Sequence, residues 1–455
     1  MEPLLGVALV ILAGSAAVWF GIQQGDRRMQ AWLDTASSCG LQVMEIIGRW
    51  ELKARAGPLE VLIEDSRQDP PRVRIGIVIP GPPDFYNVSI RPESLIPGPW
   101  VREIEIGDAP FDKTFSIEGP MRLVCALLDA ELRRLLVQAN GKNRLEIYFG
   151  RLRTEASDEE VPHILPVLLD LGQRFAQSVD VPRRLAENAQ RDPEAGVRLQ
   201  NLLLLIRELP GEAATVKALR TACSDPSPAI RLRAAKELGA EGRDVLLKLA
   251  ESMVEDDTWS AQAVSALGGD LGFERTTAIL YQALHRRRIQ TARACLEVLG
   301  LSGDAAAVEP LAKIMAQEKG ELATTAAQAL GMIGSAAAEP PLIQALQREG
   351  LDVRVAAADA LARVGSAAAV LPLKEASERS DDGELRRATR QAIAEIQSRA
   401  RGASPGQLSL AGDEAGQLSL AQAEAGQLSL ATDQAGQLSF SEDEEEPKPA
   451  PGGAA

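Results

Sequence analysis

The residues that could carry out catalysis or bind a metal are few in this chain, and they lie far apart. Only two histidines occur, His163 and His285. Neither has a second histidine, a cysteine or a carboxylate at metal-ligand spacing, and no nucleophile motif accompanies them. Asp108 and Asp112 could act as acid and base, but such a pair needs a pocket and a partner in reach, and a turn before a strand explains both. We therefore predict no catalytic residue, no metal and no cofactor.

The cysteines are equally uninformative about chemistry. They are scattered and form no CxxC pair, so the sequence predicts neither a metal site nor a disulfide framework. The four are Cys39, Cys125, Cys223 and Cys295. The last three fall in apolar helical patterns, where a buried thiol acts as a small hydrophobic side chain. No GxGxxG or GxxxxGK[ST] motif is present, so nucleotide binding has no support.

One dense basic cluster follows His285. It consists of Arg286, Arg287 and Arg288. Such a cluster can hold an anionic lipid headgroup or an acidic segment of a partner. It is also compatible with a solvated turn between two helices.

Glycines recur about every 31 residues in the second half of the chain, and they mark the same point in each copy. They are Gly211, Gly242, Gly272, Gly303, Gly334 and Gly365. Before a marker glycine, apolar residues three and four apart, such as Ala357, Ala358 and Leu361, predict a first helix. A leucine eight residues after most markers indicates a second helix. A period of this size predicts an all-α solenoid, here over residues 195–400, that works through an extended surface. We expect the second helices to line its concave face.

Within the repeats, Asp225, Arg231 and Ala234-Ala235, and again Arg354 and Ala357-Ala358, resemble HEAT repeats of the short bacterial type also found in phycobilin lyases. The resemblance covers about six units and implies that the aspartate and arginine pair within the stack. It implies a scaffold that binds other proteins, and it leaves a bilin-lyase-like enzyme or subunit as an alternative.

Residues 29–155 show alternating apolar residues and turn formers, which predict an α+β domain with a mostly antiparallel sheet. The expected strands are Trp50 to Ala56, Leu59 to Glu64, Val73 to Ile79, Tyr86 to Ile90, Val101 to Ile106 and Leu145 to Phe149. A helix is expected from Pro120 to Ala139. The stretch from Gly107 to Phe115 resembles a segment of uncharacterised bacterial membrane-anchored proteins, which brings no known chemistry. Residues 156–194 are expected to form a helical linker.

Residues 4–22 carry no charge and are long enough to cross a bilayer core of about 30 Å. Arg27 and Arg28 follow at once. Because positive residues favour the inside, we expect a single-pass anchor in a bacterial inner membrane with the body in the cytoplasm. The alternative is a cleaved signal peptide, which would make the solenoid periplasmic.

Residues 401–455 contain a ten-residue repeat rich in Gly, Gln, Ser, Ala and acids, a composition that predicts disorder. The repeated cores are four docking motifs or a spacer. Their candidate partner-binding residues are Gln407, Leu408, Leu410, Gln417, Leu418, Leu420, Gln427, Leu428, Leu430, Gln437, Leu438 and Phe440. Gln-Leu-Ser-Leu also resembles the peptide by which bacterial polymerases dock on the DNA sliding clamp. Ala411, Ala421 and Ala431 stand where that peptide often has Phe, and Phe440 comes one place early.

The chain has 64 acidic and 49 basic residues, for a net charge of −15, which argues against direct binding to nucleic acid. Taken together, the sequence predicts a multi-domain, membrane-anchored scaffold without catalysis. Its partners are other proteins, bound by the solenoid and the tail.

Overall fold

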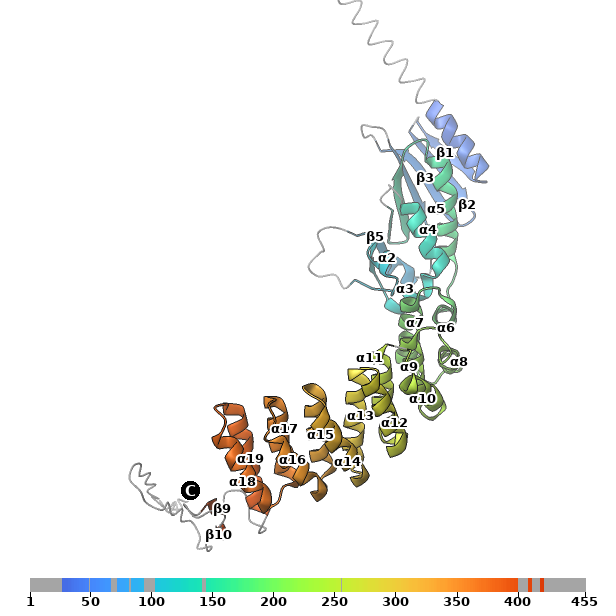
Figure 1. The fold of residues 1–455 in the computed structure, drawn as a ribbon. Coiled ribbons are helices and arrows are strands. Elements are labelled where there is room, and N and C mark those ends of the chain that lie inside the picture. The colour runs from blue at the N-terminus through green and yellow to red at the C-terminus, as the bar shows by residue number, and fades with distance from the viewer. Residues whose placement is uncertain are drawn as a thin grey trace, which may run out of the picture.

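The computed structural model describes residues 27–48, 50–66, 72–81, 83–93, 103–140, 145–254 and 256–399, together with the backbone of 408–410 and 418–420. Figure 1 shows these residues as an elongated, curved molecule, with a sheet domain at one end and a stack of helices leading away from it. The predicted combination of an antiparallel sheet domain and a helical solenoid is confirmed.

The sheet has eight strands in the order β1-β2-β3-β4-β8-β7-β5-β6, and every paired strand is antiparallel to its neighbour. The strands are β1 (Gln42–Ile47), β2 (Glu51–Ala56), β3 (Leu59–Asp65), β4 (Val73–Val78), β5 (Ser89–Pro92), β6 (Phe115–Glu118), β7 (Glu146–Tyr148) and β8 (Arg151–Ala156). The helical segments of this domain are residues 27–38, η1 (Pro83–Asn87), α2 (Ala109–Asp112), α3 (Met121–Leu127), α4 (Ala130–Asn140) and α5 (Val161–Ala176).

Several predicted elements of the sheet domain need correction. The strand expected from Tyr86 begins only at Ser89, because the preceding residues form η1. Residues 103–106 are not a strand, although the amide of Ile104 donates to the carbonyl of Ile117. The expected helix from Pro120 to Ala139 is two helices. It breaks near Asp129, whose carboxylate accepts from the amide of Leu132 at the start of α4.

The core of the sheet domain lies between the sheet and its helices. Side chains alternate along the central strands, so that Val61 and Ile63 of β3 and Ile75 of β4 are buried. Helix α5 crosses this face so closely that a Cβ on Gly172 would lie 2.8 Å from Cδ1 of Leu59. These apolar contacts fix α5 on the sheet.

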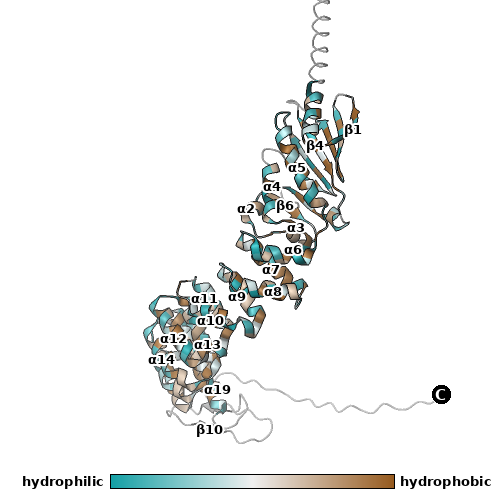
Figure 2. Cartoon of the chain, turned by 90° about the vertical axis from the view of Figure 1, so that its right-hand side faces the viewer, coloured by the Kyte–Doolittle hydropathy of each residue, from teal (hydrophilic) through white to brown (hydrophobic). Residues whose placement is uncertain are grey.

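The edge strand β1 is unlike the others, because all six of its residues are exposed. Because successive residues of a strand point to opposite faces, apolar residues of β1 are exposed on both sides of the sheet. Figure 2 shows β1 at the edge of the sheet. The largest are Val43, Met44, Ile46 and Ile47.

The helical stack consists of paired helices joined by tight turns. Its elements are α6 (Val181–Arg191), α7 (Ala195–Glu208), α8 (Ala213–Ala222), α9 (Pro228–Leu238), η2 (Gly239–Gly242), α10 (Arg243–Glu251), α11 (Asp257–Leu267), η3 (Gly268–Leu271), α12 (Gly272–His285), α13 (Ile289–Ser302), η4 (Ala305–Ala307), α14 (Val308–Gln317), α15 (Glu321–Ile333), η5 (Ala336–Ala338), α16 (Glu339–Ala345), α17 (Leu351–Val364), η6 (Ala367–Ala369), α18 (Val370–Glu378) and α19 (Gly383–Arg399). Odd-numbered helices from α7 onward are the first helices of the repeats, and even-numbered ones the second helices.

The turn between the two helices of a repeat has a local cause. Gly303 and Gly334 adopt φ of 66° and 73°, a left-handed conformation that glycine tolerates without strain. A short polar side chain follows each, and Asp304 and Ser335 accept a hydrogen bond from the amide two residues on. The chain thereby reverses direction within a few residues.

The first helices from α11 to α19 pack directly on one another, whereas the second helices approach each other much less. A Cβ added to Gly300 would lie 2.8 Å from the Cα of Ala329, and one added to Gly331 would lie 2.8 Å from the Cα of Ala360. Small residues thus let one side of the stack shorten, and the stack curves toward that side.

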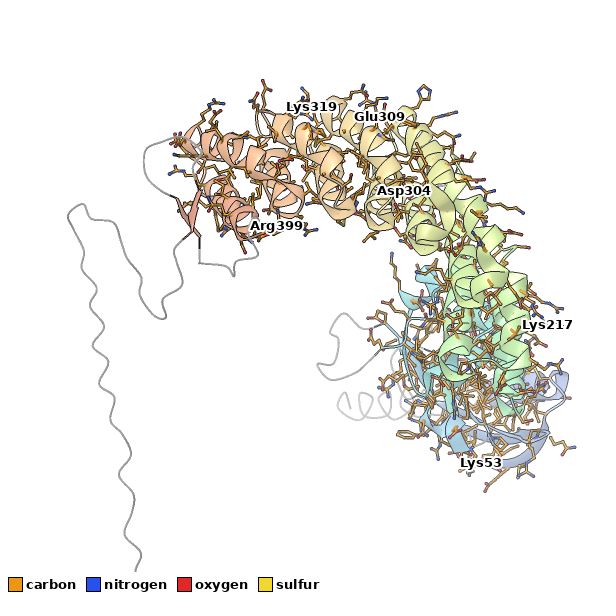
Figure 3. All side chains as sticks on the ribbon, turned by 90° about the horizontal axis from the view of Figure 1, so that it is seen from below. Lys53, Lys217, Asp304, Glu309, Lys319 and Arg399 are labelled. Atoms are coloured by element: carbon orange, nitrogen blue, oxygen red, sulfur yellow. The ribbon has the colours of Figure 1, made fainter. Side chains whose placement is uncertain are left out.

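Figure 3 shows the result. Lys217 of α8, Glu309 of α14 and Lys319, which follows α14, lie on the outer rim of the arc, and Arg399 at the end of α19 lies on its inner side. The prediction that the second helices line the concave face is therefore wrong. The first helices line it, because they carry the small residues that allow close approach.

No flexible connection separates the sheet domain from the stack. One hydrophobic core runs from Trp32 through the sheet into α9, where a second core begins and continues to α19. Gly107 before α2 and Gly196 in α7 touch backbone to backbone, since a Cβ on Gly196 would lie 2.1 Å from the carbonyl oxygen of Gly107. Residues 156–194 were expected to form a helical linker. They contain the last residue of β8 and the helices α5 and α6, and they pack against both the sheet domain and the stack.

Buried arginine-aspartate pairs cross this junction. Arg133 of α4 donates from both terminal nitrogens to Asp192, at 2.9 Å each. Arg198 of α7 likewise donates two hydrogen bonds to the carboxylate of Asp225, from Nε at 2.8 Å and from Nη2 at 2.9 Å. We call each such pair a rung. The implied pairing of Asp225 within the stack is confirmed, although its partner comes from the preceding repeat.

The membrane and tail predictions concern residues that lie largely outside the described part of the chain. Of the helices in the described part of the chain, none combines the length and hydrophobicity needed to span a bilayer. Residues 4–22 lie outside that part. In the tail, Leu408–Leu410 (β9) and Leu418–Leu420 (β10) pair as antiparallel strands, which the prediction of disorder did not include. The rest of 401–455 is outside the described residues.

The first prediction concerns the close helix contact. Gly331→Leu will destabilise α15 and α17 by about 2 kcal/mol, because the added carbons have no room against Ala360. Native-state hydrogen exchange of amides in both helices measures this. Gly383→Leu is the control, since a Cβ there meets nothing within 4 Å. Equal protection in the two variants would contradict the close contact.

The second prediction concerns the rung at Asp225. Burial alone would raise the pKa of this carboxyl, but hydrogen bonds from Arg198 and the amide of Ser227 outweigh burial and lower it. A lowered pKa stabilises the fold above the ordinary aspartate value of about 4, and the gain is lost as pH falls through the folded value. Asp225→Asn will therefore cost about 3 kcal/mol near neutral pH, and the difference from wild type will shrink in acid.

Urea unfolding at several pH values tests this. Glu241→Gln is the matched control, because Glu241 forms an exposed pair with Arg220 at 2.9 Å, and pairs in full contact with solvent contribute little to stability. A cost for Asp225→Asn that does not change with pH would mean that the charge of the carboxylate is not responsible.

Candidate protein-binding surface

The concave face carries a column of solvent-accessible side chains, one from each of the first helices α13, α15, α17 and α19. Because the repeat is regular, the same helical position returns one repeat later on the neighbouring helix. This concave column consists of Glu297, Gln328, Asp359 and Arg390. Beside it run Arg293, Thr324, Val355 and Arg386. The remaining sides of α13, α15 and α17 are almost entirely buried, so these positions are what the helices offer to a partner.

The charges of this face are mixed and mostly available. Arg293 lies 3.0 Å from Glu321 on the next helix and 3.7 Å from Glu297 on its own. These side chains are roughly half exposed, so the pairs are weak and can be exchanged for contacts with a partner. Partial burial raises the pKa of the Asp359 carboxyl, and the charges of Glu384 and Glu395 raise it further.

Two large apolar residues are exposed at the ends of α13. Ile289 at its start is 41% exposed and Leu301 at its end is 76% exposed. Large apolar side chains at protein interfaces contribute much of the binding energy once water is excluded from them. Together with the concave column they give a surface with apolar anchors and a polar surround.

The arginines predicted as an anion site are not equivalent. Arg288 is engaged within the stack, because it donates to Oγ of Ser260 at 2.9 Å and its Nε lies 3.5 Å from Asp257. Its side chain is only 11% exposed. Arg286 and Arg287 are exposed in the turn after α12. Two of the three predicted residues are therefore accessible.

Asp108 and Asp112 have structural roles. Asp108 caps α2 by accepting from the amide of Phe111 and also accepts from Nε of Arg133 at 2.8 Å. Asp112 accepts from the amides of Ile106 and Gly107 at 3.1 Å each. Burial raises the pKa of Asp112, and these two hydrogen bonds oppose the increase. Both side chains hold the α2 turn in the shape that Gly196 contacts.

The four cysteines are free thiols. Cys125 and Cys295 are buried, and burial raises the pKa of each thiol to about 12. They are protonated at neutral pH and serve as apolar side chains, as predicted. Within the described residues, no three His, Cys, Asp or Glu side chains gather in a way that could hold a metal ion.

A cavity of about 420 Å³ lies beside α4, α5 and α6. The charged side chains that line this cavity largely form ion pairs with neighbouring residues. Arg184 pairs with Asp129, Arg183 lies 2.9 Å from Glu187, and Arg174 lies 3.2 Å from Asp170. It contains no histidine or cysteine, and we assign it no chemistry.

The tail residues singled out for docking are only partly described. The structure gives backbone for Leu408, Leu410, Leu418 and Leu420. The other predicted positions, from Gln407 and Gln417 to Phe440, lie outside the described residues. The tail motifs therefore stay predictions.

Sequence reasoning missed the concave column. The repeat period shows which positions are buried, but the side toward which the stack bends depends on comparing two helix contacts. One feature of the sequence could have indicated the concave side. Ala and Gly, such as Gly300, Gly331 and Ala360, are concentrated in the helices that precede the marker glycines.

Comparison with known proteins agrees with this geometry. HEAT repeats match residues 316–394. No curated protein matches the chain. The complex of CpcE and CpcF of phycocyanin lyase from Nostoc sp. has a TM-score of 0.29 and 18% identity over 47% of this chain and 94% of that one. Human deoxyhypusine hydroxylase in complex with glycerol has a TM-score of 0.21 and 17% identity, over 48% and 96%. The match to HEAT repeats and the paired helices described above identify the stack as a HEAT-like solenoid.

Proposed function

We propose that this protein is a scaffold that binds another protein in the concave face of its solenoid. The observation that carries the proposal is the concave column together with the exposed Ile289 and Leu301. These side chains form a continuous surface over several repeats, as a long partner segment requires. Mixed charges at the column favour a partner with both acidic and basic groups.

The curvature supports the same conclusion. Helices that pack backbone to backbone keep their exposed side chains at a fixed spacing, so little conformational freedom is lost on binding. A preformed, extended surface suits recognition of another folded protein or of an extended segment.

We also propose that residues 4–22 tether the scaffold to a bacterial inner membrane with the solenoid in the cytoplasm. The support is the uncharged length of that segment and the arginines that follow it. The tether would confine the concave surface to the neighbourhood of the membrane.

The third prediction tests the binding face by site-specific photo-crosslinking in the native cell. A photoreactive residue at Gln328 on α15 will capture a partner, and the same residue at Gln344 on α16 will not. Both positions are exposed, but only Gln328 belongs to the concave column. Equal capture at both positions would contradict the proposal.

Charge reversal extends this test. Glu297→Lys, Gln328→Lys and Asp359→Lys combined will reduce capture of that partner at least tenfold, since they change the charge of the column throughout. The control combines Glu309→Lys, Gln344→Lys and Glu378→Lys, which make the same change in charge on second helices. A loss only in the control would place the partner on the outer face.

The fourth prediction concerns the tether. The full chain will stay in the membrane fraction after alkaline carbonate extraction, and Leu9→Arg with Leu12→Arg will release it, because two charges in the segment oppose insertion. Protease added to intact spheroplasts will leave the solenoid undigested. Digestion of the solenoid without membrane rupture would support the periplasmic alternative instead.

A further inference from the structure

In two repeats an aspartate stands six residues before an arginine of the first helix: Asp192 before Arg198, and Asp225 before Arg231. The aspartate and the arginine of one such spacing belong to successive rungs, since Arg198 donates to Asp225 and not to the carboxylate of Asp192. The arginine stands three residues before the paired alanines of the first helix. In α17 the equivalent arginine is Arg354, before Ala357-Ala358, and the residue six places earlier is Arg348. An arginine therefore occupies the position of the rung carboxylate.

Two guanidinium nitrogens at this place are buried without a hydrogen-bond acceptor. They are Nη1 of Arg348 and Nε of Arg354. The other terminal nitrogen of Arg348, Nη2, donates to the carbonyl of Glu318 at 2.8 Å. That bond holds the Arg348 side chain against the preceding repeat and leaves its second terminal nitrogen directed elsewhere.

Both arginines line one cavity of about 200 Å³ between α16, α17 and α18. Glu375 of α18 and Arg379 at the C-terminal end of α18 line this cavity as well. Nη2 of Arg379 lies 2.8 Å from a carboxylate oxygen of Glu375. Three guanidinium groups thus share a single carboxylate.

An arginine side chain stays protonated in proteins, so these two groups cannot lose their charge by giving up a proton. A buried charged donor without an acceptor costs several kcal/mol. The intact rungs show how this fold meets that cost, with a carboxylate that accepts two hydrogen bonds from a guanidinium. At Arg348 and Arg354 the protein itself supplies no such group.

We propose that this cavity binds an oxyanion, a phosphate or carboxylate group that bridges Arg348 and Arg354. Guanidinium groups match such ligands through paired N–H donors. The cavity is several times the roughly 30 Å³ that one water occupies, so it admits an ion the size of phosphate. The oxyanion has two possible sources: free phosphate, or the acidic run 442–446 of the chain's own tail, which follows the last helix.

The fifth prediction tests binding by calorimetric titration of inorganic phosphate into the full chain at low ionic strength, with chloride as the competing salt. Wild type will bind one phosphate per chain. Arg348→Gln and Arg354→Gln will each weaken binding at least tenfold. Arg363→Gln, an exposed arginine of α17 outside the cavity, will leave it unchanged.

A charge reversal gives a second test, in which folding is checked separately. Arg348→Asp places a carboxylate at the position that Asp225 occupies in its own repeat, where it faces Arg354 and Arg379 across the cavity. This variant will keep the circular dichroism spectrum of wild type and will lose phosphate binding. Unchanged phosphate binding in Arg348→Asp overturns the proposal.

A further arm separates the two sources. A full chain in which residues 442–446 are changed to glutamine or asparagine will bind phosphate more tightly than wild type if the tail occupies the cavity. Equal affinity assigns the cavity to free phosphate. If neither this variant nor wild type binds phosphate, the cavity is not an oxyanion site.

Discussion

The structure depends on how closely the first helices approach one another. Glycine and alanine at Gly300, Ala329, Gly331 and Ala360 let neighbouring backbones touch. This contact shortens one side of the stack, sets its curvature and turns the remaining exposed positions of those helices toward the inside of the arc. The exposed column of the concave face is thus a consequence of side chains too small to be part of it.

The sheet domain belongs to the same physical unit as the start of the solenoid. Arg133 lies on a helix of the sheet domain but pairs with Asp192 as the arginines of the repeats pair with theirs. The backbone contact of Gly107 with Gly196 leaves no space for the two parts to slide. Buried charge and close packing therefore extend the repeat interaction into a domain that has no repeat of its own.

The sequence was most informative where one residue type had one physical role. The marker glycines, and the apolar spacing before each of them, predicted the helix pairs. Strands β1, β6 and β8 were missed. β1 has no buried side chain, β6 has only four residues, and in β8 Leu152 and Thr154 alternate with charged residues. The break at Asp129 was hidden by the apolar spacing that runs through it.

The direction in which the stack curves could not be predicted from single helices. It depends on the difference between two distances, that between neighbouring first helices and that between neighbouring second helices. Arg348 and Arg354 are visible in the sequence, but only the structure shows that Nη1 of Arg348 and Nε of Arg354 are buried without an acceptor.

The two hydrophobic cores meet inside α9, and there the first helices α9 and α11 touch far less than those that follow. Stiffness is therefore uneven along the molecule. The sheet domain with α6 to α8 forms one closely packed part and the repeats from α11 to α19 another, so any change in the curvature of the arc would be concentrated where these two parts meet.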